Sequence, residues 1–143
     1  MSVTEHAWFI AKIAIGLYLA KVVSRKFLDF VFSFIIYMPN TPTKELKYPD
    51  ANPEGYRSPA DYGYDYDNIS VVTKDGLILR GWLIMQPNPK KCATMIFFHG
   101  NAGNIGNRLP NLKYLFERNR VNIVIVGYRG YGYSEGSPSE SGL

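Results

Sequence analysis

The segment HGNAGNIG, residues 99–106, has the residue types and spacing of a loop that holds a ligand with its backbone. Small residues between a strand and a helix let the main chain come close to a ligand, with N–H groups pointing at it. Three chemistries use such a loop: dinucleotide binding, phosphate binding, and stabilisation of the oxyanion that forms during acyl transfer.

The first two chemistries fit the sequence poorly. A dinucleotide-binding fingerprint is G-x-G-x-x-G, whereas Gly100 and Gly103 are three residues apart and no acid ends the next predicted strand. A phosphate-binding P-loop continues with Lys and then Ser or Thr, and no Lys follows Gly106. The His-Gly pair that begins at His99, directly after an apolar run, favours an oxyanion loop. A glycine-rich turn without a ligand is the alternative.

Ser134 lies in the segment Gly132–Gly136, which matches the nucleophile-elbow pattern G-x-S-x-G. An elbow requires a strand that runs straight into the serine and a helix that starts straight after it. The preceding predicted strand ends at Gly127, and the next helix signal begins only at Ser137. No histidine follows Ser134 that could take its proton. We therefore interpret Ser134 as a structural residue.

The composition narrows the classes of function. The net charge is +4, but the basic residues of the C-terminal part are scattered, which indicates a solvated surface rather than a nucleic-acid face. The single Cys92 excludes an intrachain disulfide, and with only His6 and His99 it leaves no cluster for a metal site. We therefore expect no metal, no cofactor and no nucleic-acid partner.

Apolar periodicity predicts four strands. The alternating segments 69–73 and 77–85 flank a turn signal, Lys74-Asp75-Gly76, and predict a β-hairpin. The continuous apolar runs 94–98 and 122–127 predict two further strands, each buried on both faces. The glycine-rich loop follows directly on the first of these runs.

A helix is predicted between the two apolar runs. Apolar residues recur at helical spacing over 105–116, and Pro110 places the start of the regular helix near Leu109. A hairpin followed by strand–helix–strand indicates an α/β fold, with a mixed sheet and a right-handed parallel crossover, in a domain of residues 68–143. A further helix start is signalled at 137–140, which suggests that the domain is incomplete.

Residues 1–38 carry the longest apolar stretch. Ala7–Val23 is apolar except for Lys12 and Lys21, and seventeen residues is the short end of what spans a bilayer. The two lysines fall on opposite helix faces, which suits snorkelling from a spanning helix better than a surface helix. No small-x-small cleavage site follows, which disfavours a signal peptide. We predict a single-pass anchor in a lipid membrane, of open orientation, with a buried helix as the alternative.

Two segments lie between this stretch and the hairpin. Phe27–Met38 is a shorter apolar stretch that we expect at the membrane interface or packed on the domain. Residues 39–67 contain five prolines and many tyrosines. Proline blocks regular hydrogen-bonded ladders and tyrosine favours packing, so we predict an extended connector that lies against the domain or the headgroups.

Two C-terminal segments together resemble the Bem46-like family of membrane-attached α/β-hydrolases. They are FFHGNAGNIGNRLPNL, which begins at Phe97, and GYRGYGYSEGSPSESGL, which begins at Gly127. Upstream, YMPN from Tyr37, GYRSP from Gly55 and TKDG from Thr73 are similar to the family's approach to its hairpin. The resemblance thus extends from about residue 37 to the end of the sequence.

The resemblance implies a serine hydrolase of esters or thioesters with the α/β-hydrolase fold. The backbone N–H groups of Asn101 and Ala102 would stabilise the oxyanion. In this fold the chain order is nucleophile, acid, histidine, so His99 is not the catalytic base. The residues that would shape the site are His99, Gly100, Gly103, Tyr128, Arg129, Gly130 and Gly132.

By the same resemblance, no member of the catalytic triad lies in this chain, which we expect to be inactive alone. Related membrane hydrolases with a similar loop remove fatty acyl groups from protein cysteines, which suggests depalmitoylation and an acyl ester or acyl thioester as the substrate of the complete protein. A truncated, non-catalytic membrane protein or interaction module is the alternative. An unpaired strand at 94–98 would leave the chain marginally stable at best.

Overall fold

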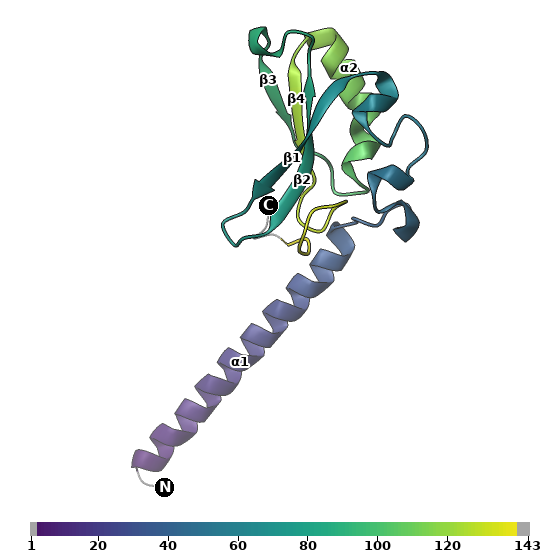
Figure 1. Cartoon of the computed structure of the whole chain (residues 1–143). Helices are drawn as coiled ribbons and strands as arrows, with labels where there is room; N and C mark the ends of the chain where they lie inside the picture. The colour runs from purple at the N-terminus through teal and green to yellow at the C-terminus, as the bar shows by residue number, and fades with distance from the viewer. Residues whose placement is uncertain (1–2, 140–143) are drawn as a thin grey trace. The chain divides into compact units, whose positions relative to one another are not determined.

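The computed structural model describes the backbone of residues 3–139, with the side chains at 3–7, 29 and 32–34 outside the description. The chain divides into two compact units, one up to Ile36 and one from Tyr37 onward. The first contains the helix α1 (Val3–Ile36). The second contains a mixed sheet, the helix α2 and several 3₁₀ turns (Figure 1).

Helix α1 is continuous across the two apolar stretches of the N-terminal sequence. The predicted span Ala7–Val23 and the apolar stretch from Phe27 belong to one helix of 34 residues. The polar group between them does not end it, because Arg and Lys are good helix formers and a helical Ser can bond back along the turn. Ser24 does this by donating to the carbonyl of Lys21 over 2.9 Å.

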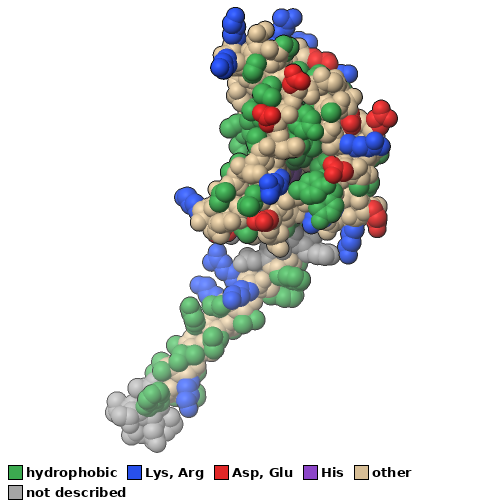
Figure 2. Space-filling model, viewed as in Figure 1, with side chains coloured by type: hydrophobic (Ala, Val, Ile, Leu, Met, Phe, Trp, Pro, Cys, Tyr) green, Lys and Arg blue, Asp and Glu red, His purple; other side chains and the backbone are tan. Residues whose placement is uncertain are grey.

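The predicted transmembrane anchor is not found in α1. Among the residues described, no helix is both long and apolar enough to cross a membrane. Lys12, Lys21, Arg25 and Lys26 interrupt the apolar residues, and Figure 2 shows hydrophobic and basic side chains along the length of the helix. The side chain of Ala7, where the predicted span begins, lies outside the described residues.

The sheet has four strands in the order β1-β2-β4-β3. β1 (Asp65–Val72) and β2 (Ile78–Met85) form the predicted antiparallel hairpin, and β2 continues antiparallel to β4 (Asn122–Val126). β3 (Thr94–Phe97) is parallel to β4. The mixed sheet and its parallel strand–helix–strand connection are therefore as predicted.

The prediction that the strand at 94–98 is buried on both faces is wrong. Met95 and Phe97 pack partly against the core, whereas Ile96 is 62% exposed and Phe98 is 75% exposed. β3 is the edge strand of the described sheet, and the helix α2 covers only one face of that sheet (Figure 1). A continuous apolar run indicates burial on both faces only when both faces have a neighbour.

Helix α2 (Leu109–Asn119) starts at the residue predicted from Pro110, after a 3₁₀ turn over Ile105–Arg108. Its apolar face buries Leu112 and Phe116 against the inner face of the sheet, in a core with fully buried residues of β2 and β4. The helix start predicted at 137–140 is not seen at 137–139, which have no regular structure, and residue 140 lies outside the described residues.

The proline-rich segment before β1 packs on the domain through short 3₁₀ turns. Three of them precede the hairpin and a fourth follows it: Lys44–Leu46, Pro49–Ala51, Pro59–Tyr62 and Pro89–Lys91. Pro49 and Pro59 are buried, and the ring of Tyr64 packs on Phe116 with centroids 4.4 Å apart. The tyrosines of this segment thus extend the core along α2.

A pair of buried asparagines joins this segment to the start of the helical region. The side-chain amides of Asn52 and Asn104 bond to each other in both directions, over 2.9 and 3.2 Å. Asn104 also donates to the carbonyl of Leu46 over 2.9 Å and accepts from the N–H of Gly106 over 2.9 Å. Both amides are almost fully buried, so each bond replaces one that water would otherwise make.

Replacing Asn104 with alanine removes these bonds and leaves the buried Asn52 amide with its oxygen unpaired and only its bond to the carbonyl of Tyr56, at 2.8 Å. We expect N104A to lower the free energy of unfolding by about 3 kcal/mol, because stranded buried polar groups carry their full desolvation cost. Urea unfolding of the full chain measures this. Asn111→Ala, at an exposed position of α2, is the matched control, and equal losses in the two variants would contradict the role assigned to Asn104.

Candidate active site

Two loops lie at the same edge of the sheet. The loop of residues 99–103, which we call the oxyanion loop after its predicted role, follows β3, and the post-β4 loop, residues 127–136, follows β4. Since β3 and β4 are parallel neighbours, their carboxyl ends meet at one edge, which is where ligands bind in α/β sheets. The structure therefore brings together the two segments whose sequence resembles the family.

Hydrogen bonds to the carbonyl groups fix the direction of two successive N–H groups in the oxyanion loop. The carbonyl of Gly100 lies 2.7 Å from Nδ1 of His99. The carbonyl of Asn101 accepts from the Met38 N–H over 2.9 Å and from the Tyr131 hydroxyl over 2.8 Å. In a planar trans peptide the N–H points opposite to the C=O. The N–H groups of Asn101 and Ala102 are thus both turned away from the groups that hold the loop.

The rest of the loop is held by Met38 and Arg108. Met38 forms an isolated parallel bridge with Ala102, and its carbonyl accepts from the Gly103 N–H over 3.0 Å. The guanidinium of Arg108 donates to the carbonyl of Ala102. No acceptor for the Ala102 N–H is found among the described residues.

His99 is a buried structural residue of this site. Its side chain is 4% exposed and lies against the rings of Tyr128 and Tyr131. Nε2 accepts from the Tyr128 N–H over 3.1 Å, so the proton of the neutral ring is on Nδ1, where it reaches the carbonyl of Gly100. Burial lowers the pKa of His99, its bond to Gly100 partly opposes this, and the charge of Arg108 lowers it further.

Both ring nitrogens of His99 are therefore engaged with the backbone. The ring connects the oxyanion loop to the post-β4 loop and is held in its neutral form. This arrangement supports a shaping role for His99 and leaves no free nitrogen to act as a general base.

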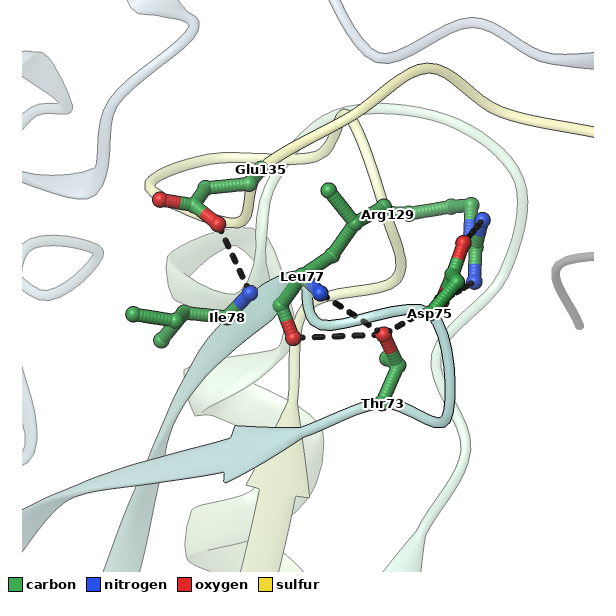
Figure 3. A network of polar contacts seen from close by, with 6 residues as sticks. All are labelled: Thr73, Asp75, Leu77, Ile78, Arg129 and Glu135. Carbon is green, nitrogen blue, oxygen red and sulfur yellow. Dashed lines mark hydrogen bonds and ion pairs between the residues drawn. The ribbon is translucent and has the colours of Figure 1, made fainter.

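Ser134 is buried, and its hydroxyl is used in the fold. Oγ donates to the carbonyl of Gly127 over 2.6 Å and accepts from the N–H of Arg80 over 3.0 Å. The carboxylate of the next residue, Glu135, accepts from the Ile78 N–H over 2.8 Å (Figure 3). The Glu135 N–H donates to the Ile78 carbonyl over 3.0 Å. Together Ser134 and Glu135 line the start of β2, where β4 does not reach, and no strand leads directly into Ser134. The geometry of a nucleophile elbow is not seen here.

Arg129 joins the post-β4 loop to the turn of the hairpin. Its guanidinium makes a two-pronged contact with Asp75, at 2.9 and 3.1 Å, and Thr73 donates to the same carboxylate (Figure 3). The hydrogen bond from Arg129 is the main reason that the pKa of Asp75 is lowered to about 2. Such a bidentate pair fixes orientation as well as distance.

Two glycines give the post-β4 loop its path. Gly130 and Gly132 have φ values of 81° and 56°, which are strained for other residues. A Cβ at Gly130 would also stand 2.6 Å from Cδ of Pro138. Glycine at these positions lets the loop fold back on itself and place the side chain of Tyr131 under the oxyanion loop.

Three residues with a large part in the site were not among its predicted members: Met38, Arg108 and Tyr131. Each holds a carbonyl of the oxyanion loop from another part of the chain. All three stand inside motifs that carried the family resemblance, which was the available signal in the sequence. No group of His, Cys, Asp or Glu that could hold a metal occurs among the described residues.

Comparison with curated proteins finds relatives over most of this chain. Protein bem46 of Schizosaccharomyces pombe is 41% identical over 105 residues, which are 70% of this chain and 35% of that protein. The alpha/beta hydrolase domain-containing protein WAV2 of Arabidopsis thaliana is 33% identical over 109 residues, 76% of this chain and 33% of WAV2. The chain is a Bem46-like α/β-hydrolase sequence. The resemblance drawn from the two C-terminal segments is thereby confirmed.

This Bem46-like chain spans about a third of the length of the curated relatives it matches. Another relative, named as the uncharacterized membrane protein YNL320W of Saccharomyces cerevisiae, is 36% identical over 86 residues, 60% of this chain and 30% of that protein. No family model matches. Among solved structures, the esterase Pf2001 of Pyrococcus furiosus covers 58% of this chain and 32% of its own, with 23% identity and a TM-score of 0.48, which is too low to carry an inference.

The lowered pKa of His99 predicts a pH dependence of stability. Because the folded pKa lies below the unfolded value of about 6.5, the unfolded state binds the proton more readily. Burial of the neutral His99 ring therefore costs no stability well above pH 6.5. As the pH falls below 6.5, the unfolded state gains a proton that the folded state resists, and the free energy of unfolding decreases. We expect the urea midpoint of the wild type to fall from pH 7.5 to pH 5 more steeply than that of His99→Gln. His6→Gln should keep the wild-type slope, and a wild-type slope in H99Q would contradict the prediction.

Proposed function

We propose that this Bem46-like chain contributes the oxyanion-binding part of a serine hydrolase of esters or thioesters. The observation that carries the proposal is the orientation of the Asn101 and Ala102 peptides, whose carbonyls are held by His99, Met38 and Tyr131. Two adjacent N–H groups fixed in this way suit the oxygen of a tetrahedral intermediate.

In the proposed reaction a serine oxygen bonds to the carbonyl carbon of the substrate, while a histidine takes the hydroxyl proton. The carbonyl oxygen becomes an oxyanion and accepts hydrogen bonds from the loop. Collapse of the intermediate breaks the bond to the leaving alcohol or thiol, which receives the proton from the histidine, and water then hydrolyses the acyl-enzyme by the same route. The part of this chain is to stabilise the charge on the oxygen in both steps.

We propose that the nucleophile and its base are not among the described residues. The hydroxyl of Ser134 and both nitrogens of His99 are occupied by backbone groups. Neither residue bonds to the other in the described structure, so no serine–histidine pair is formed between them. The chain taken alone is therefore proposed to be inactive.

The substrate class follows from the same chemistry. An oxyanion loop serves acyl transfer from oxygen or sulfur esters equally, because the developing charge is on the carbonyl oxygen in both. Removal of a fatty acyl group from a protein cysteine is a thioester hydrolysis of this kind, and we propose it as the substrate reaction of the complete protein.

A chimera tests the role of the loop. Residues 37–139 of this chain replace the aligned region of S. pombe bem46, and hydrolysis of p-nitrophenyl esters and an acyl thioester is measured. We expect the chimera to hydrolyse esters and Ala102→Pro, which deletes the N–H donor, to lower kcat by roughly 10²–10³-fold. Ala102→Ser keeps the N–H and should retain most of the activity.

Three outcomes would count against the proposal. An inactive, folded chimera would contradict the hydrolase function itself. Equal activity of the Ala102→Pro and Ala102→Ser chimeras would contradict the donor role of Ala102 but would leave the hydrolase function standing. Labelling of Ser134 by a fluorophosphonate probe, in the chimera or in the 143-residue chain, would overturn its assignment as a structural residue.

We further propose that α1 attaches the protein to a lipid membrane. Large apolar side chains are exposed along the described part of the helix, including Trp8, Ile10, Leu17 and Phe30 at 65–70%. Such a surface is unfavourable in water and favourable in the acyl boundary of a bilayer, where the stems of Lys12 and Lys21 can bring their charges to the headgroups. A relative carries the name of a membrane protein, which supports the proposal.

Vesicle flotation tests the attachment. We expect the full chain to float with phosphatidylcholine vesicles, and a variant with Ile10, Leu17 and Leu19 replaced by asparagine to remain in the lower fraction. The control variant replaces Lys12 and Lys21 with glutamine and should still float. Extraction at alkaline pH separates a peripheral helix, which is released, from an inserted one. Failure of the unmodified chain to float would contradict the proposal.

A further inference from the structure

A cavity of about 600 Å³ opens in the second unit, between the proline-rich segment, the β1–β2 hairpin and the post-β4 loop. Its lining includes two arginines, Arg57 and Arg80, from different segments of the chain. No residue of the oxyanion loop lines it. The oxyanion role therefore gives no account of this cavity or of its two arginines.

The guanidinium groups of these two arginines have spare hydrogen-bonding capacity. Arg57 donates from Nε to the carbonyl of Asn52 over 2.9 Å, and Arg80 donates from one terminal nitrogen to the Ser70 hydroxyl over 2.6 Å. Among the described residues, neither is paired with a carboxylate, whereas Arg129 is. Two arginines without acidic partners at one cavity raise the local positive potential.

Asp50 is the one carboxylate among the lining residues, so it offsets at most one of the two arginine charges. Asp50 accepts a hydrogen bond of 2.5 Å from the hydroxyl of Tyr133, and this bond is the main reason that the pKa of Tyr133 is raised to about 12. The ring of Tyr133 in turn stacks on Tyr48, with centroids 4.7 Å apart. Because tyrosine is a neutral donor, the Asp50 carboxylate keeps its negative charge, and two arginines against one aspartate leave the lining with a net positive charge.

Apolar side chains form the other part of the lining. Trp82, which is 7% exposed, and Tyr66 contribute adjacent rings in an edge-to-face contact with centroids 6.2 Å apart. Ile69 and Ile105 also line the cavity. A site that joins a few convergent polar groups to apolar walls is typical of small-molecule binding.

We propose that this cavity binds a small anionic molecule whose carboxylate or phosphate group is held by Arg57 and Arg80, with an apolar body against Trp82 and Tyr66. Guanidinium groups match the planar spacing of such oxygens and are weakly hydrated, so they bind these anions at little desolvation cost. The hydroxyl groups of Ser58 and Ser70 stand in the same lining and add donors.

Occupancy of the cavity would reach the candidate active site through Tyr131. This residue lines the cavity and also donates its hydroxyl hydrogen to the carbonyl of Asn101. The binding site does not depend on the hydrolase function, and each can be tested without the other.

Fluorescence of Trp82 reports on the cavity directly. The chain has two tryptophans, so Trp8→Phe leaves Trp82 as the single emitter. The full chain with this substitution is titrated with hexyl phosphate, hexanoate, inorganic phosphate and hexanol. We expect saturable changes with the two hexyl anions, weaker binding of inorganic phosphate, and none with hexanol. The relative affinity of the phosphate and the carboxylate identifies the preferred group.

Charge-removing variants test the two arginines. Arg57→Met and Arg80→Met should each weaken binding about tenfold, in line with loss of a charge-assisted hydrogen bond. Lys90→Met removes an exposed cation outside the lining and should leave the affinity unchanged. Arg80→Lys keeps the charge and should retain part of the binding. The urea midpoints of all variants are compared, so that weaker binding caused by loss of charge is separated from weaker binding caused by unfolding.

The proposal would be overturned by no saturable change with either hexyl anion, by equal binding of hexanol, or by equal affinities of the R57M, R80M and K90M variants. Raising the salt concentration from 50 to 500 mM should weaken binding of the anions, since the two arginines are screened. Binding that is insensitive to salt would count against an electrostatic site.

Discussion

The hydrogen bonds of the buried Asn104 side chain hold together the part of the structure that carries the candidate active site. The side chain is fully buried, and it bonds at once to two points of the proline-rich segment, the carbonyl of Leu46 and the amide of Asn52, and to the start of the helical region. A buried amide is tolerated only when its hydrogen bonds are made, so these two segments can meet in one arrangement. The oxyanion loop ends one residue before Asn104, so the hydrogen bonds of Asn104 also fix the position of the C-terminal end of the loop.

From that fixed end, the loop is held by its carbonyl groups. Oxyanion donors must be in place before the charge forms, because reorganising them during the reaction would cost part of the stabilisation. His99, Met38 and Tyr131 bond to the carbonyls of these peptides, and a planar peptide then fixes the direction of its N–H as well. Gly106 adds to this rigidity, because a Cβ there would stand 2.1 Å from the carbonyl oxygen of Tyr56.

Local signals in the sequence were sufficient for the elements that carry these loops. The turn residues 74–76 located the hairpin, and Pro110 located the first residue of α2. Both signals act on the backbone of their own neighbourhood, so they could be interpreted without knowing the fold.

Predictions that depend on distant neighbours were less successful. Burial of the strand at 94–98 required a layer on its second face, and none is present in the described structure, so Ile96 is exposed. The partners of the oxyanion loop are separated from it by many residues: Tyr131 lies 30 residues from Asn101. Spacing along the chain does not encode such contacts, and only the family resemblance pointed toward them.

The contacts of the post-β4 loop have a consequence for the order of folding. Arg129 and Ser134 bond to hairpin residues 54 positions earlier, and Glu135 bonds to one 57 positions earlier. The hairpin can close on its own residues, whereas the loop has no partner until the helix α2 and the strand β4 are in place. During synthesis the segment that shapes the candidate active site thus takes its final form after the hairpin, α2 and β4.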